Sequence, residues 1–350
     1  MQADQLATLP VTVDSLTTDR HERDTSSGFT RVTTEISLHG DGATGRGEDV
    51  TYESAEHDAL AADGLPDLAG EYTFAEFSAT VSDRSLFPTP PDRDVSRNYR
   101  QWALESAALD LGLRQADTDF ASLVGHEYEP VRFVASTRLG EPPTTDRIDA
   151  IQGQVPDAEF KLDPTPDWDD DLVATLAETG SVRILDLKGH YDDTTVDVSV
   201  DPALYERLIK RLPNTIIEDP ALTEATQPLF EVDSIRERVS WDEPIESLED
   251  VKALPWTPSW LNIKPSRFGS LRSVLETLSY CGQHGIRCYG GGQFELGVGR
   301  GQIQALASLF YPEHPNDVAP RGYNDPDITG ELPASPLDPP AELTGFRWER

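Results

Sequence analysis

From about Pro130 to Pro320 the chain alternates short apolar runs with amphipathic segments, and this alternation limits the fold more than any other feature. The segments between the runs have helical periodicity, and several begin with Ser or Asp and end with Gly. Strands that alternate with helices form a parallel sheet, and seven or eight such units favour a closed barrel. The predicted strands lie at 131–137, 158–163, 182–188, 214–219, 238–243, 260–264 and 286–292.

The first part of the chain, residues 1–128, is predicted to be a separate α+β domain. The alternating, β-branched run at 30–38 predicts a strand, and the Ala- and Leu-rich run at 98–115 predicts a strong helix. The polar stretch between Val13 and Gly28 is predicted to be a mobile loop. The barrel would then occupy 129–320, and the Pro/Asp-rich tail 321–350 would pack on the first domain or on the barrel rim.

Charged residues end four successive apolar runs of the predicted barrel: Asp186, Glu218, Asp242 and Lys264. By subtraction they are 32, 24 and 22 residues apart, the length of one strand plus one helix and two loops. A buried, unpaired charge is costly, and the carboxyl ends of barrel strands meet at one mouth. The spacing therefore predicts one shared polar site.

Three carboxylates from neighbouring strands are hard oxygen ligands, and without His or Cys they favour Mg²⁺, with Mn²⁺ as an alternative. A lysine on the next strand neutralises such a cluster, and with a lowered pKa it acts as a base. A divalent ion opposite an amine suits removal of a proton next to a carboxylate.

The predicted barrel contains the segments IIEDP, VSWDEPIESLEDVKAL, NIKPSRFGSL and YGGGQFELGVGR, and the first part of the chain contains TRVTTEISLHG, GEDVTY and RQWALESAALDL. These segments resemble the enolase superfamily, and more narrowly its muconate-lactonizing, o-succinylbenzoate synthase and dipeptide epimerase branch. The resemblance implies a (β/α)7β modified TIM barrel with an N-terminal α+β capping domain. It also implies a lyase or isomerase that abstracts the α-proton of a small carboxylate substrate to a metal-stabilised ene-diolate, and elimination (dehydration) or isomerisation follows.

By this resemblance Asp186, Glu218 and Asp242 hold the metal, and Lys264 is the base or a stabilising cation. The family also has a Lys-x-Lys pair on the second strand. Here only Lys161 is present, and if it takes the first position, Asp163 replaces the usual base.

Four further residues are candidates for supporting roles. Adjacent strand residues point in opposite directions, so Asp219 and Glu243 are expected to support the metal ligands rather than bind the metal. Glu295 falls near the end of the seventh strand, where it either contacts substrate or begins a helix. Arg20 lies on the polar loop of the first domain. The resemblance implies that this loop closes over the site and sets specificity, and the alternative is a solvated loop without such a role.

Lys188 follows Asp186 by two residues and should face the same side of its strand. It would either supply the ammonium missing from the second strand or form a salt bridge to a neighbouring carboxylate. Lys161, Lys188 and Lys264 are therefore the candidate catalytic lysines. They are three of only five lysines in the chain.

The formal net charge of −34, from 29 basic and 63 acidic residues, argues against nucleic acid and anionic membranes as partners. Acidity with few lysines is typical of a halophile, because molar salt screens like charges. Two cysteines and no long apolar run predict a reduced, cytoplasmic protein. The family resemblance implies a homo-oligomer.

Two other functions fit the same sequence. The EDP and DEP sequences and the Gly-rich seventh strand suit an acid-sugar dehydratase. The broken Lys-x-Lys pair suits a carboxylate-binding relative that has lost turnover. Fold alone does not choose among them.

Overall fold

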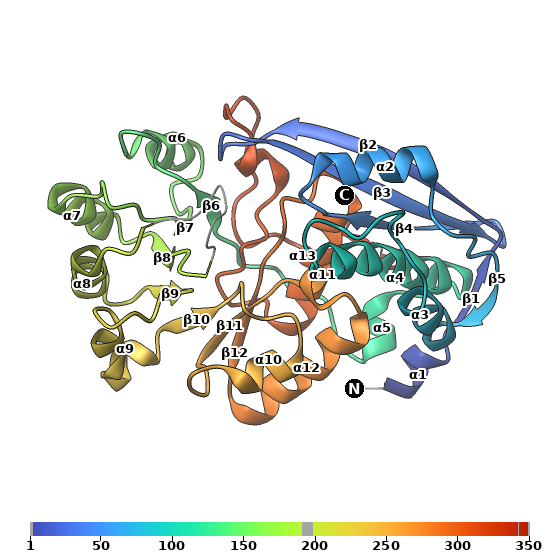
Figure 1. The fold of residues 1–350 in the computed structure, drawn as a ribbon. Coiled ribbons are helices and arrows are strands. Elements are labelled where there is room, and N and C mark those ends of the chain that lie inside the picture. The colour runs from blue at the N-terminus through green and yellow to red at the C-terminus, as the bar shows by residue number, and fades with distance from the viewer. Residues whose placement is uncertain (1–2, 191–198, 342, 349–350) are drawn as a thin grey trace.

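The computed structural model describes residues 3–190, 199–341 and 343–348. Its centre is a seven-stranded parallel sheet whose strands follow one another in chain order (Figure 1). The strands are short and their residues are almost all buried, as expected when helices cover a parallel sheet. They are β6 (Ala135–Thr137), β7 (Phe160–Leu162), β8 (Val182–Asp186), β9 (Ile216–Glu218), β10 (Val239–Trp241), β11 (Trp260–Ile263) and β12 (Arg287–Gly290).

The segment at Asn316 and Asp317 closes this sheet into a barrel. Asn316 forms a parallel bridge with Phe133, just before β6, and Asp317 forms one with Gly291, just after β12. The Val134 N–H donates to the Asn316 carbonyl at 2.8 Å, and the Asp317 N–H donates to the Gly290 carbonyl at 2.8 Å. Seven strand–helix units and a closing strand make the predicted (β/α)7β barrel, which is confirmed.

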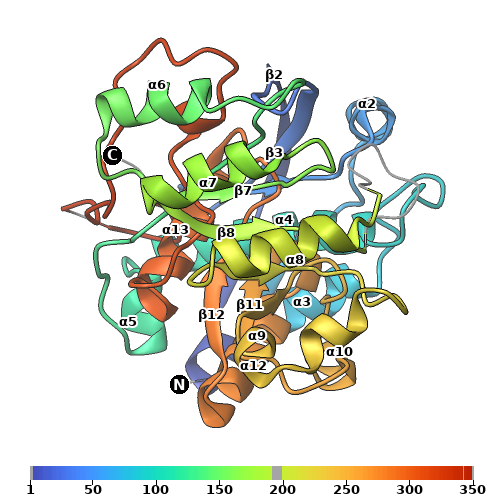
Figure 2. The same ribbon diagram turned by 90° about the vertical axis from the view of Figure 1, so that its left-hand side faces the viewer.

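The barrel helices lie outside the strands (Figure 2). Several begin at the predicted polar caps: the side chains of Asp169, Asp201, Ser247 and Ser270 accept backbone N–H groups of the first turn. The helices are α6 (Asp146–Gln154), α7 (Asp170–Thr179), α8 (Pro202–Arg211), α9 (Asp233–Arg236), α10 (Leu248–Ala253), α11 (Pro265–Phe268), α12 (Leu271–His284) and α13 (Val298–Phe310), with the 3-10 turns η1 (Gln227–Glu231) and η2 (Arg321–Asn324).

The N-terminal part forms an α+β layer beside the barrel (Figure 1). An antiparallel sheet of β2 (Ser15–Asp24), β3 (Thr30–Gly40) and β4 (Ala43–Asp49) packs on the long helix α4 (Ser96–Gln115). A Cβ at Gly47 would lie 2.0 Å from the Ala103 carbonyl oxygen of α4, so this glycine is what lets β4 approach the helix. The other elements are α1 (Ala3–Ala7), β1 (Pro10–Val13), α2 (Ser54–Asp63), β5 (Gly70–Thr73), α3 (Phe74–Ser82) and α5 (Phe120–Val124).

The mobile loop predicted between Val13 and Gly28 is wrong, because most of it is strand β2. This strand pairs with β3 along its whole length, from Ser15 opposite His39 to Asp24 opposite Thr30. Its side chains are nearly all exposed, so it lacks the apolar alternation that marks a half-buried strand. The hairpin turn is confined to the few residues before Thr30.

Glu48 of β4 joins the capping sheet to the barrel. Its carboxylate accepts the backbone N–H groups of Leu296, Gly297 and Gly299 at 2.6, 2.9 and 2.8 Å. These groups lie at the start of helix α13. Unsatisfied N–H groups and the helix dipole favour an anion there. The loop between β12 and α13 is therefore held from the capping side.

The tail after η2 runs back over both parts of the molecule. Leu337 bridges to Val131 beside the barrel, and Gly345 bridges to Asp119 at the start of α5. Phe346 is fully buried, with its ring 4.9 Å from that of Phe120. Within the described residues, no helix is long and apolar enough to cross a membrane.

Candidate functional site

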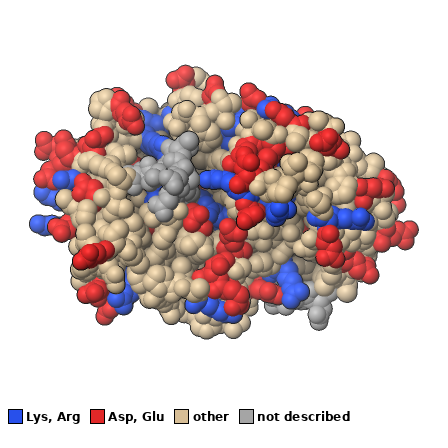
Figure 3. Space-filling view, viewed as in Figure 1, with Lys and Arg blue, Asp and Glu red and all other residues tan. Residues whose placement is uncertain are grey.

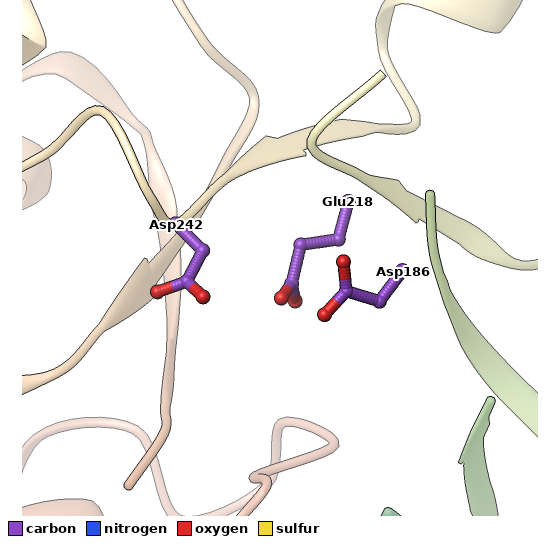
Figure 4. Close-up of side chains that lie close together, drawn as sticks. All are labelled: Asp186, Glu218 and Asp242. Carbon is purple, nitrogen blue, oxygen red and sulfur yellow. The ribbon is translucent and has the colours of Figure 1, made fainter. Parts of the chain in front are cut away.

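The three predicted carboxylates converge at the carboxyl ends of neighbouring strands. Asp186 and Glu218 end β8 and β9 and are directly opposite in the parallel register, and Asp242 follows β10. One oxygen from each lies within 4.8 Å of the other two, and all three residues are buried. Their side chains point toward one another (Figure 4). We call Asp186, Glu218 and Asp242 the triad.

The triad fits a hard divalent cation. It offers only carboxylate oxygens, the ligands that hard cations such as Mg²⁺ and Mn²⁺ prefer. Softer metals prefer nitrogen or sulfur ligands. Three buried carboxylates this close together also repel one another, so they need positive charge nearby. Asp186, Glu218 and Asp242 would hold such a cation.

The three candidate lysines supply that positive charge in this structure. The Lys161 ammonium contacts Glu218 and lies 3.2 Å from an oxygen of Asp186. The Lys188 ammonium contacts the same Asp186 oxygen. The third ammonium, that of Lys264, lies 2.6 Å from Asp242. Each carboxylate of the triad therefore touches at least one ammonium.

These contacts shift the protonation equilibria. Burial alone would raise the pKa of Asp186, but the Lys188 and Lys161 charges outweigh it and hold that pKa below its usual range. Burial is likewise outweighed at Asp242, where Lys264 and Arg267 lower the pKa to about 2. For Lys161, burial favours the neutral amine, but Glu218 and Asp186 raise its pKa well above the usual value. At Glu218 burial is not outweighed by the Lys161 charge, and together with the charges of Asp186 and Asp242 it raises the pKa of that carboxyl well above its usual value. The outer two carboxylates of the triad are therefore held in the charged form, and the central one is not.

Three polar residues that the sequence analysis missed hold Glu218 in place. The Tyr289 hydroxyl donates to one carboxylate oxygen and accepts from Ser240 at 2.9 Å. The Asn262 amide lies 3.3 and 3.4 Å from the two carboxylate oxygens. Ser240 and Asn262 precede Asp242 and Lys264 by two residues, so the period of two in a strand places them on the same face. That spacing is the signal that could have found them.

Asp219 and Glu243 lie beside the triad without belonging to it. The Asp219 carboxylate accepts the backbone N–H groups of Asp242 and Glu243 at 2.8 and 2.9 Å. Burial and the charges of Asp242 and Asp186 raise the pKa of Asp219 to about 7. Asp219 thus fixes the backbone that carries Asp242.

A cavity of about 420 Å³ lies over the three lysines. Tyr52, Tyr99 and the hairpin residues Ser27, Gly28 and Phe29 line it from the capping side. Asp163 and Asp317 are the two acids among its described lining residues. Seven cations line it: Arg93, Arg138, Lys161, Lys188, Lys264, Arg267 and Arg300. Figure 3 shows several Lys and Arg near the middle of this face, among Asp and Glu that are spread over the whole of it.

Asp163 lies between two of these cations. Its carboxylate is 3.2 Å from the Arg138 guanidinium and 3.9 Å from the Lys188 ammonium. Asp163 stands at the strand-two position where the resemblance predicted a lysine, and it faces Lys188, which follows the next strand. The expected salt bridge of Lys188 to a neighbouring carboxylate is present, and Lys188 also lines the cavity.

Arg20 and Glu295 lie outside the described lining of this cavity and outside the contacts of the triad. Arg20 is on the exposed strand β2, where it pairs with Glu22 at 2.5 Å and Asp58 at 3.3 Å. Glu295 is buried under its own loop, where it accepts the Gln293 N–H at 2.7 Å. Because β2 is a strand, only its hairpin end reaches the site, and that end does not include Arg20.

Comparison with known proteins gives the family. Residues 4–123 match the N-terminal domain, and residues 127–325 the C-terminal domain, of a domain of unknown function, DUF8230. The chain belongs to the DUF8230 family. The DUF8230 chain has the enolase-superfamily fold: a member of that superfamily from Listeria innocua superposes with a TM-score of 0.66 at 19% identity, covering 91% of this chain and 88% of the other. The predicted resemblance is confirmed.

Two relatives carry more specific names. An o-succinylbenzoate synthase of Bacillus subtilis is 26% identical over 239 residues, which are 64% of the DUF8230 chain and 60% of that enzyme. The match thus spans less than two thirds of the relative. A dipeptide epimerase of Methylococcus capsulatus, solved with a Mg ion, superposes with a TM-score of 0.65 at 18% identity, covering 92% and 91% of the two chains. Identities this low establish a shared fold, not a shared reaction.

Proposed function

We propose that this DUF8230 protein is a Mg²⁺-dependent lyase or isomerase that removes the α-proton of a carboxylate substrate. The observation that carries the proposal is the buried triad, with its oxygens within 4.8 Å of one another and the Lys264 ammonium beside it. A divalent cation held there would offset the negative charge that grows on the substrate carboxylate as the proton leaves. Mn²⁺ would suit the same ligands.

Lys264 is our candidate for the group that takes the proton. It lines the cavity at the end of β11, where its ammonium pairs with Asp242. To act as a base it must first lose its own proton, and a cation bound by Asp242 would weaken the ion pair that favours the charged form. Lys188 lines the same cavity from the loop after β8. Strand β9 lies between β8 and β10, the strand that precedes Asp242. Two amines on different strands suit a reaction in which one group removes a proton and another returns one or assists a leaving group.

The charge of the cavity supports a substrate with more than one anionic group. Seven described lining residues are cationic, and they outnumber the two lining acids and the triad together. Arg138 also lines the cavity. Among its described side-chain hydrogen bonds, its guanidinium donates through Nε to Asp163. We assign to it the binding of a second anionic group of the substrate, because a guanidinium can donate to two carboxylates along different edges.

Two alternatives have specific support. Asp163, in place of a strand-two lysine, suits dehydration, in which an acid on one side assists loss of a hydroxyl. The three ion pairs that neutralise the triad suit a binding protein without turnover. Such a protein would bind metal and carboxylates but exchange no α-proton.

A library of carboxylates, incubated with the protein in ²H₂O with Mg²⁺ and molar KCl, tests the proposal. Mass spectrometry would report deuterium at the α-carbon even when turnover is slow. We expect exchange with at least one dianionic acid, lost on chelation of the metal. Binding without exchange for every acid would favour the non-catalytic alternative, and a dehydrated product from an acid sugar would favour the dehydratase.

A further inference from the structure

Lys161 contacts two of the carboxylates that a metal ion would use. Its side chain is 2% exposed, and its ammonium contacts Glu218 and lies 3.2 Å from Asp186. These are two of the three proposed metal ligands. A divalent ion on the same oxygens would lie close to the Lys161 ammonium, and a buried site screens the repulsion between the two charges poorly.

A third carboxylate is within reach of the same ammonium but outside the triad. An oxygen of Asp317 lies 3.4 Å from the Lys161 ammonium. The Asp317 side chain is 17% exposed and lines the cavity. A small movement of the lysine side chain would therefore exchange Glu218 for Asp317 without leaving the ammonium unpaired.

The barrel holds Asp317 firmly in this position. Its backbone N–H donates to the Gly290 carbonyl at 2.8 Å, as part of the closing strand. The preceding residue, Asn316, is fully buried; its side chain accepts the Gly290 N–H at 2.7 Å and donates to the Arg132 carbonyl at 2.9 Å. Asp317 thus has a fixed backbone, and the flexible partner is Lys161.

We propose that Asp317 is a positioning residue that receives the Lys161 ammonium when a divalent cation occupies the triad. The metal and the lysine then share the site in place of competing for Glu218. The inference rests on the proposed metal site but not on any particular reaction. It gives the closing strand of the barrel a function beyond completing the sheet.

The test is the Mg²⁺ affinity of the full chain, measured by isothermal titration calorimetry in high salt. We expect Asp317→Asn to weaken Mg²⁺ binding by about tenfold, the usual cost of removing a partner of a metal ligand. In a Lys161→Met background the same change should have almost no effect, because no ammonium needs a second partner. Lys161→Gln provides a second background if the methionine variant folds poorly.

Lys188→Met is the matched control background. Lys188 also contacts the triad, but its second acidic partner is Asp163, not Asp317. Asp317→Asn should therefore keep its full effect in this background. Equal effects of Asp317→Asn in all backgrounds would overturn the proposal, since they would indicate only a general loss of negative charge.

A crystal structure with Mg²⁺ gives a direct measurement. We expect the Lys161 ammonium within hydrogen-bonding distance of Asp317 and separated from Glu218. A lysine that remains on Glu218 beside the bound metal would overturn the inference. Failure of the wild-type chain to bind Mg²⁺ at all would instead contradict the proposed function, so the two failures are distinguishable.

Discussion

The Lys264 ammonium lies 2.6 Å from an Oδ atom of Asp242, across the short gap between the ends of two neighbouring barrel strands. Both residues are buried, and the same Asp242 lies 3.8 Å from Arg267. The pair joins a proposed metal ligand, Asp242, to the proposed base, Lys264. A change to Lys264 alone should therefore remove proton transfer while Mg²⁺ binding remains.

Lys264→Ala should abolish α-proton exchange while Mg²⁺ still binds. Loss of a general base typically lowers a rate by roughly 10²–10⁴-fold. Deuterium incorporation by mass spectrometry and calorimetric Mg²⁺ titration measure the two effects. The control is Lys252→Ala, since Lys252 is an exposed helix residue paired with Glu249. Full exchange in the Lys264 variant would remove Lys264 from the role of base.

Tyr289→Phe should weaken Mg²⁺ binding with little loss of stability. The hydroxyl is a donor to Glu218 and an acceptor from Ser240, and its removal leaves Glu218 with fewer partners to hold it. We expect a drop in affinity of about tenfold and a destabilisation of about 1 kcal/mol. Calorimetry and urea unfolding measure these quantities. A variant that lost stability but kept its Mg²⁺ affinity would show that Tyr289 only supports the core.

Arg138→Gln should discriminate between substrates. If Arg138 binds a second anionic group, the KM of the variant should be about tenfold higher or more for a dianionic acid. Its KM for a monocarboxylate should be unchanged. Arg183→Gln is a matched control, because Arg183 is equally exposed at 33% and also pairs with a carboxylate, that of Glu159. Equal losses for both kinds of acid would contradict the assignment.

The buried pair of Arg100 and Asp49 should make stability depend on pH in a defined direction. Burial would raise the pKa of Asp49, but Arg100, 2.7 Å away, outweighs it and holds that pKa below its usual value of 3.8. The pair therefore contributes its full stability above about pH 4. That contribution is lost as the pH falls below 3.8 toward the lower pKa of the folded state.

Arg100→Met removes the partner and leaves a buried carboxylate. We expect a loss of about 3–5 kcal/mol at pH 7. The loss should shrink toward pH 4, since the unpaired Asp49 of the variant can take up a proton. Urea unfolding at the two pH values measures the difference. Arg272→Met, which removes an exposed pair with Glu276, should change stability little at either pH. A pH-independent loss in the Arg100 variant would contradict this account.

The sequence predicted the barrel and the triad because both depend on local patterns. A charged residue at the end of an apolar run marks the mouth of a barrel, and the parallel register then brings Asp186, Glu218 and Asp242 together. Lys161 and Lys188 followed from the same reasoning. The period of two along a strand would have added Asn262 and Ser240.

Other parts of the site depend on contacts that no local pattern shows. The closing strand at Asn316 and Asp317 has no apolar run; it is held by hydrogen bonds to β6 and β12, so Asp317 was missed. Strand β2 is polar on both faces and looked like a loop. Phe29 reaches the cavity only because the hairpin of β2 and β3 is long enough to carry its tip there.

The carboxylate of Glu48 has a consequence for protein engineering. It accepts hydrogen bonds from three backbone N–H groups between Leu296 and Gly299. These residues closely follow Gln293 and Phe294, which line the cavity. A chimera that exchanged the N-terminal sheet for that of a relative without an acid at this position would leave those groups unpaired. The loop would then loosen next to the substrate. Altered specificity is therefore better sought by changing single residues at the hairpin tip than by exchanging whole modules.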